Sequence, residues 1–178
     1  MATTVFVTGA SGYIGHHVAV AFRNAGYRVY GLVRSKEKGK DSTSEPVPST
    51  LVEGEALIRN EVIPVVGDQR KPETWEWVVE KATYVIDTVP DYRYEEPWKG
   101  SRTLLEALAK SSEATGVRKT FIQTSGILMY PDSSEVRDEN SPFPPAEHPF
   151  LQVARDFEKH VLTHPVVCPL PCPSLLDS

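Results

Sequence analysis

Short apolar segments alternate with longer amphipathic ones along most of this chain. The first apolar run, Thr4 to Thr8, is rich in β-branched residues and predicts a strand that leads into a glycine-rich turn and a helix. Further apolar runs, each bounded by polar or glycine-containing turns, predict strands at 27–33, 62–66, 83–90 and 119–125. Apolar residues at helical spacing predict helices between and after these strands, at 51–58, 72–81, 100–115 and 150–162.

This alternation predicts an α/β fold with a Rossmann-like, doubly wound parallel sheet. Strands joined through helices pair in parallel, and such a sheet needs helices on both faces. We expect five or six strands in the order 3-2-1-4-5(-6), where a sixth strand would begin at Val166, and ligands at the carboxyl ends of the strands. The predicted domain covers residues 1–167. Residues 168–178 are expected to form an irregular tail because three prolines interrupt them.

A glycine-rich turn separates the first strand from the first helix. Gly9 lets the chain turn sharply off the strand, Gly12 leaves room for a pyrophosphate beside the backbone, and Gly15 lets the helix pack close to the sheet. The unpaired N–H groups at the start of the helix attract phosphate. The candidate pyrophosphate-binding residues are Gly9, Ser11, Gly12, Tyr13, Ile14 and Gly15. The alternative is a structural glycine turn without a ligand.

The segment Thr8-Gly9-Ala10-Ser11-Gly12-Tyr13-Ile14-Gly15 resembles the TGxxGxxG fingerprint of the short-chain dehydrogenase/reductase superfamily, in its NAD-dependent epimerase/dehydratase branch. The resemblance covers about residues 3 to 162. It implies an NAD(P)-binding oxidoreductase or epimerase that acts on a sugar nucleotide or another carbonyl or hydroxyl compound. It also implies that Asp68, after the third strand, meets the adenine, although a turn-capping role for Asp68 is an equally simple interpretation. Thr88 and Val89 would lie against the cofactor at the end of the fourth strand.

Arg34 bears on the choice between the two nicotinamide cofactors. It follows the second strand, where an acid would bind the ribose 2′-hydroxyl of NAD and an arginine accommodates the 2′-phosphate of NADP. We therefore expect NADP, with NAD as the alternative. A solvated basic loop would explain the same residue without any ligand.

The catalytic residues are less well defined by the sequence. The segment 121–130 resembles the active-site strand of the family, and the resemblance makes Ser125, with Thr124 beside it, the candidate that polarises the substrate oxygen. A serine that only closes its own turn is the alternative. The family's Tyr-x-x-x-Lys pair is missing from the predicted helix at 150–162. Arg155 and Lys159 are expected on an exposed face of that helix, and His148 and His160 are isolated alternatives for acid–base chemistry.

Composition narrows the classes of partner. The chain has 178 residues and a net charge of −5, which argues against nucleic acid or an anionic membrane surface as the main partner. If the chain is catalytic, its expected partner is a small-molecule substrate. With no long apolar run and no leader-like N-terminus, the expected location is the cytoplasm. Two cysteines in the tail support neither a disulfide framework nor a zinc site.

Family members continue for a hundred or more residues that build the substrate pocket, so the resemblance also implies that this chain is C-terminally short and lacks the family's substrate domain. Two further interpretations therefore stay open. The chain is either a non-catalytic NADP-binding sensor or interaction module, or a truncated and inactive fragment of a longer enzyme.

Overall fold

The computed structural model describes residues 2–34, 55–89, 96–126, 136–138, 141–142 and 149–165. Outside these ranges lie residues 127–130, His148, the sixth strand expected at Val166 and the tail at 168–178. The elements in chain order are β1 (Thr4–Thr8), α1 (Tyr13–Asn24), β2 (Arg28–Val33), α2 (Glu55–Arg59), β3 (Ile63–Val66), the 3-10 helix η1 (Pro72–Thr74), α3 (Glu76–Lys81), β4 (Tyr84–Asp87), α4 (Lys99–Thr115), β5 (Thr120–Gln123) and α5 (Pro149–Leu162).

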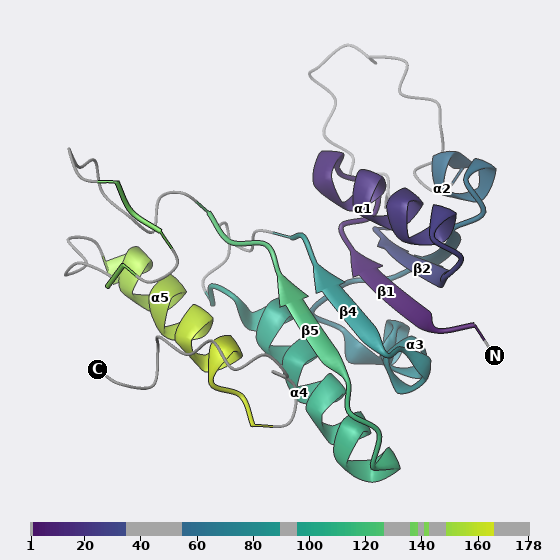
Figure 1. The fold of residues 1–178 in the computed structure, drawn as a ribbon. Coiled ribbons are helices and arrows are strands. Elements are labelled where there is room, and N and C mark those ends of the chain that lie inside the picture. Colours follow the sequence, from purple (N-terminus) through teal and green to yellow (C-terminus); the bar gives the residue numbers. More distant parts are fainter. Residues whose placement is uncertain are drawn as a thin grey trace, which may run out of the picture.

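The five strands form one parallel sheet in the order β3-β2-β1-β4-β5, which confirms the predicted topology (Figure 1). β1 lies at the centre, with Phe6 opposite Tyr30 of β2 and Val85 of β4. β3 is an edge strand, which is why it tolerates Pro64. The carboxyl ends of all five strands therefore meet along the same edge of the sheet.

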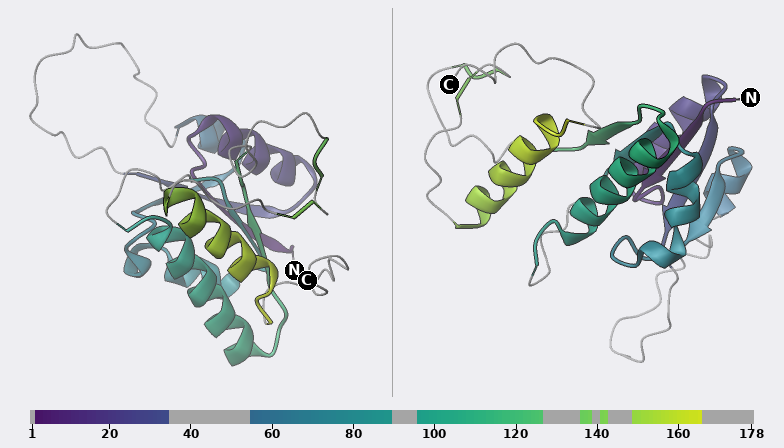
Figure 2. Two further views of the ribbon diagram at one scale, coloured as in Figure 1. Left: turned by 90° about the vertical axis from the view of Figure 1, so that its left-hand side faces the viewer. Right: turned by 90° about the horizontal axis from the view of Figure 1, so that it is seen from below.

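Helices cover both faces of the sheet, as expected for a doubly wound fold (Figure 2). Val5 and Val7 of β1 point into a core that is closed by Ala19 of α1 and Leu57 of α2. The intervening Phe6 points to the opposite face, into a core formed with α3, α4 and α5. The other buried members of that second core are Tyr30, Leu32, Val65, Trp75, Val78, Val79, Ala82, Val85, Trp98, Leu104, Leu105, Leu108, Ala109, Phe121, Ala154 and Phe157.

The helix predicted over 72–81 is divided into η1 and α3. Trp75 stands between them with φ −141° and ψ −9°, and its buried indole N–H donates a hydrogen bond of 3.0 Å to the carbonyl of Asp68. Satisfying the indole N–H takes precedence over a continuous helix. Trp77, in contrast, is 44% exposed, and the Lys81 ammonium lies over its ring.

α5 lies beside α4 on one face of the sheet, as the two views of Figure 2 show. Phe157 of α5 is fully buried and stacks on Trp98, with ring centroids 5.6 Å apart. The guanidinium carbon of Arg102 in α4 is 5.0 Å from the centre of the Phe157 ring. Ala154, also fully buried, faces the same core. These contacts fix which side of α5 faces the sheet.

None of the helices in the described part of the chain combines the length and the apolar character that crossing a lipid bilayer requires.

A buried lysine joins β5 to the preceding helices. Lys119, 3% exposed, donates hydrogen bonds to the carbonyls of Val79 (2.9 Å) and Glu80 (2.8 Å) at the end of α3 and to Ser111 Oγ (2.7 Å) of α4. An ammonium group has three donors, so this one is fully satisfied. The positive charge also suits the C-terminal end of α3.

We predict that Lys119→Met lowers the free energy of unfolding by about 1 to 3 kcal/mol, because it leaves buried acceptors without a donor. Urea unfolding followed by circular dichroism measures the loss. Lys110→Met, on the exposed side of α4, should leave the midpoint unchanged. Equal midpoints for both variants would contradict the structural role of Lys119.

Candidate functional site

The glycine turn lies at the carboxyl end of β1, where the sequence predicts it. Gly9 has φ +64°, a left-handed conformation that favours glycine. The N–H of Gly12 donates to the carbonyl of Gly9 at 2.8 Å, and the N–H of His16 donates to the carbonyl of Gly12 at 3.0 Å. The intervening N–H groups, at the start of α1, have no acceptor within the helix and are available to an anion.

Two of the glycines serve different steric purposes. A Cβ at Gly15 would lie 2.7 Å from both the carbonyl carbon of Gly9 and Thr88 Oγ1, so only glycine allows the helix to approach this closely. A Cβ at Gly12 would meet only the carbonyl oxygen of Gly9, at 3.1 Å, and otherwise open space. The exposed backbone at Gly12, with Ser11, Tyr13 and Ile14 also exposed around it, forms a cradle that fits a pyrophosphate.

The end of β2 lies beside this cradle. The N–H of Ala10 donates to the carbonyl of Leu32 at 3.3 Å, which joins the glycine turn to the last residues of β2. Arg34 follows β2 directly and is exposed. The structure therefore brings Arg34 to the same edge of the sheet as the glycine turn.

Asp68 has the turn-forming role that the sequence left open. Its side-chain Oδ1 accepts the N–H of Arg70 at 2.9 Å, and its carbonyl accepts the indole N–H of Trp75 at 3.0 Å. The residue is exposed at the carboxyl end of β3. A contact with adenine is compatible with this position and stays a prediction.

Thr88 and Val89 lie against the glycine turn. Thr88 Oγ1 donates to the carbonyl of Thr8 at 2.7 Å, and the N–H of Thr88 donates to Thr8 Oγ1 at 3.3 Å. A Cβ at Gly9 would lie 2.8 Å from Thr88 Oγ1 and 3.0 Å from the Val89 Cγ2 methyl. The exits of β1 and β4 therefore form one continuous surface.

A buried carboxylate that the sequence analysis did not single out holds these exits together. Asp87 Oδ1 accepts hydrogen bonds from Thr8 Oγ1 (2.6 Å), Gln69 Nε2 (3.1 Å) and the N–H of Val89 (3.2 Å). Gln69 Nε2 also lies 3.4 Å from Ser101 Oγ, which adds the first turn of α4 to the cluster. The sequence did contain a signal for Asp87, because it is an acidic residue at the end of an otherwise apolar strand.

A negative charge on the buried Asp87 carboxyl costs free energy in this position. Burial raises the pKa of the Asp87 carboxyl, and the neighbouring hydroxyls of Ser101 and Thr8 oppose that rise. Among the described residues, no group has hydrogen-bonding geometry to Asp87 Oδ2 or to Gln69 Oε1, and both are buried acceptors. A proton on the carboxyl would supply the donor that this cluster lacks.

The two candidate catalytic residues follow β5. The N–H of Thr124 donates to the carbonyl of Asp87 at 2.9 Å, which carries the β4–β5 pairing to the carboxyl edge. Ser125 is exposed there, and its hydroxyl donates to Glu158 Oε1 of α5. Burial raises the pKa of the half-buried Glu158, while the hydrogen bond from Ser125 and the charge of Arg155 lower it. Sequence reasoning missed Glu158 because no local pattern connects it to Ser125.

α5 also corrects one expectation. Arg155 is not on an exposed face: its side chain is 5% exposed, whereas Lys159 and His160 are exposed. The buried side of α5 extends to Arg155 because Ala154 and Phe157 on either side of it anchor the helix in the core. No tyrosine occurs in α5. Within the described residues, no group of three or more histidine, cysteine or acidic side chains could hold a metal ion.

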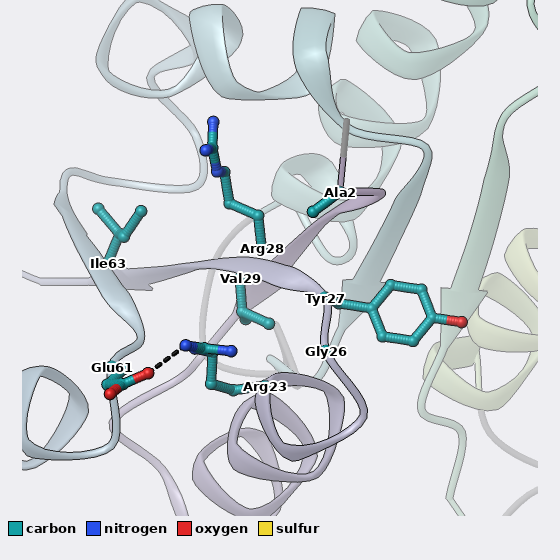
Figure 3. A pocket seen from close by; sticks show the side chains of 8 residues that line it. All are labelled: Ala2, Arg23, Gly26, Tyr27, Arg28, Val29, Glu61 and Ile63. Carbon is teal, nitrogen blue, oxygen red and sulfur yellow. Dashed lines mark hydrogen bonds and ion pairs between the residues drawn. The ribbon is translucent and has the colours of Figure 1, made fainter.

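A cavity of about 250 Å³ lies away from this site (Figure 3). Its lining includes Ala2, Arg28 and Ile63, which stand at or just before the amino ends of β1, β2 and β3. An ion pair between Arg23 and Glu61 crosses it. Because parallel α/β sheets bind ligands at the opposite, carboxyl edge, we do not assign the nucleotide to this cavity.

The fold and the glycine cradle define a Rossmann-type nucleotide-binding protein, and comparison with known proteins identifies its family. The family model "NAD dependent epimerase/dehydratase family" matches residues 5–150. The chain therefore belongs to the NAD-dependent epimerase/dehydratase family.

Individual relatives agree with this assignment. The chain is 30% identical over 138 residues to the NAD-dependent epimerase/dehydratase terH of Aspergillus terreus, covering 75% of this chain and 39% of that protein. UDP-glucose 4-epimerase from Bifidobacterium longum, solved with NAD⁺ and UDP, has the same fold with a TM-score of 0.62, 21% identity, and coverage of 89% of this chain and 48% of that one. Leucoanthocyanidin reductase from Vitis vinifera, solved with NADPH, gives a TM-score of 0.52 at 25% identity, with coverage of 89% and 45%.

The chain spans about two fifths of the length of the curated relatives that it matches over most of its own length. The cofactor class of the family is NAD(P).

We predict that replacing Asp87 by Asn changes how stability depends on pH. The folded-state pKa of Asp87 is raised above its ordinary value of 3.8, so the folded protein binds a proton more readily than the unfolded chain does. The wild-type chain should therefore lose stability as the pH rises from about 4 through the raised pKa, whereas Asp87→Asn should not lose this contribution.

Melting temperatures of both proteins between pH 4 and 8 test this prediction. Asp87→Asn should melt at or above the wild type at pH 8, and the gap should close or reverse on acidification. Asp156→Asn, which removes an exposed acid on α5, should follow the wild type throughout. Parallel curves for Asp87→Asn and wild type would show that the buried carboxyl carries no such cost.

Proposed function

We propose that this chain is the cofactor-binding part of an NADP-dependent oxidoreductase or epimerase that transfers a hydride between the nicotinamide and a carbonyl or hydroxyl group of a small molecule. The observation that carries the proposal is the open glycine cradle at the end of β1, with Thr88 and Val89 packed against it, in a chain that belongs to an NAD(P)-dependent family. When bound, the cofactor would supply the hydride acceptor or donor.

Different residues around the cradle would bind different parts of the cofactor. The backbone from Gly9 to Gly15 would hold the pyrophosphate at the start of α1, with Ser11, Gly12, Tyr13 and Ile14 on its surface. Asp68 would meet the adenine at the end of β3, and Thr88 and Val89 would lie against the cofactor at the end of β4. These roles follow from their shared place on the carboxyl edge of the sheet.

Arg34 supports NADP as the preferred cofactor. It stands beside the cradle at the end of β2, and a guanidinium can bind a phosphate through two parallel hydrogen bonds. An exposed arginine gives the 2′-phosphate of NADP a partner that NAD does not use. Relatives of this fold were solved with either cofactor, the vine reductase with NADPH and the Bifidobacterium longum epimerase with NAD⁺, so the preference rests on Arg34.

Ser125 is the proposed catalytic residue, with Thr124 beside it. Its exposed hydroxyl lies at the carboxyl edge, where it can hydrogen-bond to the substrate oxygen as that oxygen gains or loses charge. The substrate is a small hydroxyl or carbonyl compound, with sugar nucleotides as one class. The absence of a tyrosine from α5 favours a second candidate, an NADP-binding module without turnover.

Thermal-shift titration of the whole chain with NADPH and NADH tests cofactor binding directly. A ligand that binds only the folded state adds about 2.7 kcal/mol of stability at a concentration of 100 times its Kd. We expect a saturable shift that is larger with NADPH. A chain that melts cooperatively but shifts with neither ligand would contradict the proposal, and a shift without oxidation of NADPH by any aldehyde or ketone would favour the binding module.

We predict that Gly12→Asp abolishes the NADPH shift and keeps the fold. The backbone at Gly12 is extended, with φ −82° and ψ 170°, and a side chain there has open space in front of it. An aspartate suits the N-cap but places a negative charge where the pyrophosphate would bind. Gly12→Asn, which has the same shape without the charge, should retain clearly more binding. Equal NADPH binding by both variants would contradict the placement of the pyrophosphate at the glycine cradle.

We predict that Arg34→Ala lowers the affinity for NADPH by about 10-fold or more and changes the affinity for NADH little. A charge-assisted hydrogen bond contributes about 1.5 to 3 kcal/mol, and only NADPH has the phosphate to accept one here. Isothermal titration with each nucleotide measures the difference. Arg28→Ala is the matched control, because Arg28 is an exposed arginine at the opposite end of the same strand. Equal losses of NADPH and NADH in Arg34→Ala would remove the basis for preferring NADP.

A further inference from the structure

Ser125 and Glu158 meet at the carboxyl edge of the sheet although they are distant in the chain. Ser125 follows β5, and Glu158 belongs to the C-terminal half of α5. The Ser125 hydroxyl donates a hydrogen bond to Glu158 Oε1. Through this contact Glu158 of α5 reaches Ser125, the residue that we propose to contact the substrate.

The core holds Glu158 in this position. Its neighbour Phe157 is fully buried and stacked on Trp98, and Ala154, one turn earlier, is fully buried as well. Both residues face the core shared with α4, so the rotation of α5 about its axis is fixed. Glu158 then stands at the margin of that core, half-buried and next to the end of β5.

The surroundings of Glu158 suit a group that takes and returns a proton. Burial raises the pKa of Glu158, opposed by the Ser125 hydrogen bond and by the charge of Arg155 on the same helix. The Ser125 hydroxyl, just after β5, faces Glu158, and from α4 the Arg102 guanidinium lies over the ring of the neighbouring Phe157.

We propose that Glu158 is the proton acceptor and positioning residue for Ser125, so that this hydroxyl–carboxyl pair performs the proton transfer that the family's tyrosine and lysine would otherwise perform. The inference rests on the proposed function. Glu158 acts through Ser125 and not on the substrate directly.

The proton and the hydride leave the substrate separately. During oxidation the substrate hydroxyl gives its proton to Ser125 Oγ while Ser125 gives its own proton to Glu158 Oε1. A bound oxidised nicotinamide would accept the hydrogen of the hydroxyl-bearing carbon as a hydride, with its electron pair, so that the carbon–oxygen bond becomes a carbonyl. During reduction both transfers reverse, and the carboxyl returns its proton through Ser125 to the new alcohol.

The test compares the wild-type chain with Glu158→Gln and with Asp156→Asn, which changes an exposed acid on the same helix. NADPH binding is measured first, by thermal shift. NADPH oxidation is then followed with a panel of aliphatic and aromatic aldehydes from pH 5 to 9. We expect all three proteins to bind NADPH alike. Glu158→Gln should lower kcat by about 100-fold and remove one ionisation from its pH profile, and Asp156→Asn should match the wild type.

A second readout does not depend on turnover. The side-chain carboxyl carbons of ¹³C-labelled glutamates are titrated by NMR, and the signal of Glu158 is identified by its absence from Glu158→Gln. Ser125→Ala should raise the midpoint of the Glu158 titration further, because the hydrogen bond that favours the charged form is lost.

The outcomes separate the two proposals. No NADPH binding by the wild type overturns the proposed function. NADPH binding and turnover with an unchanged rate and pH profile in Glu158→Gln overturn the inference alone, as does a Glu158 titration that Ser125→Ala leaves in place. Binding without turnover on the whole panel also overturns it, since a proton-transfer pair then has no reaction to serve.

Discussion

The close approach of α1 to the exits of β1 and β4 is the constraint on which the candidate site depends. Gly15 allows this approach, because any side chain there would collide with the backbone of Gly9 and with Thr88. The carboxylate of Asp87 joins the same exits through Thr8 and the N–H of Val89. The glycine cradle, Thr88 and Val89 beside it, and the end of β2 are therefore joined by direct contacts, as a preorganised nucleotide site requires.

Two buried charges show how structural and functional needs differ in this fold. Lys119 has a hydrogen-bond partner for each of its three donors, and it joins the sheet to α3 and α4 at the amino edge. Asp87 lies at the carboxyl edge and retains a buried oxygen without a donor among the described residues. A fully satisfied charge contributes to stability, whereas an incompletely satisfied one costs free energy and occurs more often near functional sites.

The proposed chemistry depends on how α5 packs more than on the sequence of α5. The helix lacks the tyrosine of the family's pair, yet it brings a different acid to the end of β5. Phe157 and Ala154 determine this arrangement by occupying the core beside Trp98. A core contact thus selects which polar residue of the helix can reach the candidate catalytic serine.

The sequence by itself determined the class of fold, the strand order and the place of the nucleotide cradle, because strand and helix periodicity and glycine spacing are local properties of the chain. It also placed Arg34, Thr88, Val89 and Ser125 at strand ends, which parallel topology gathers on one edge. Only the tertiary structure decided that Asp87 connects three strand exits, that Arg155 is buried and that Glu158 reaches Ser125. Those facts depend on contacts between distant segments, and such contacts leave no periodic signal in the sequence.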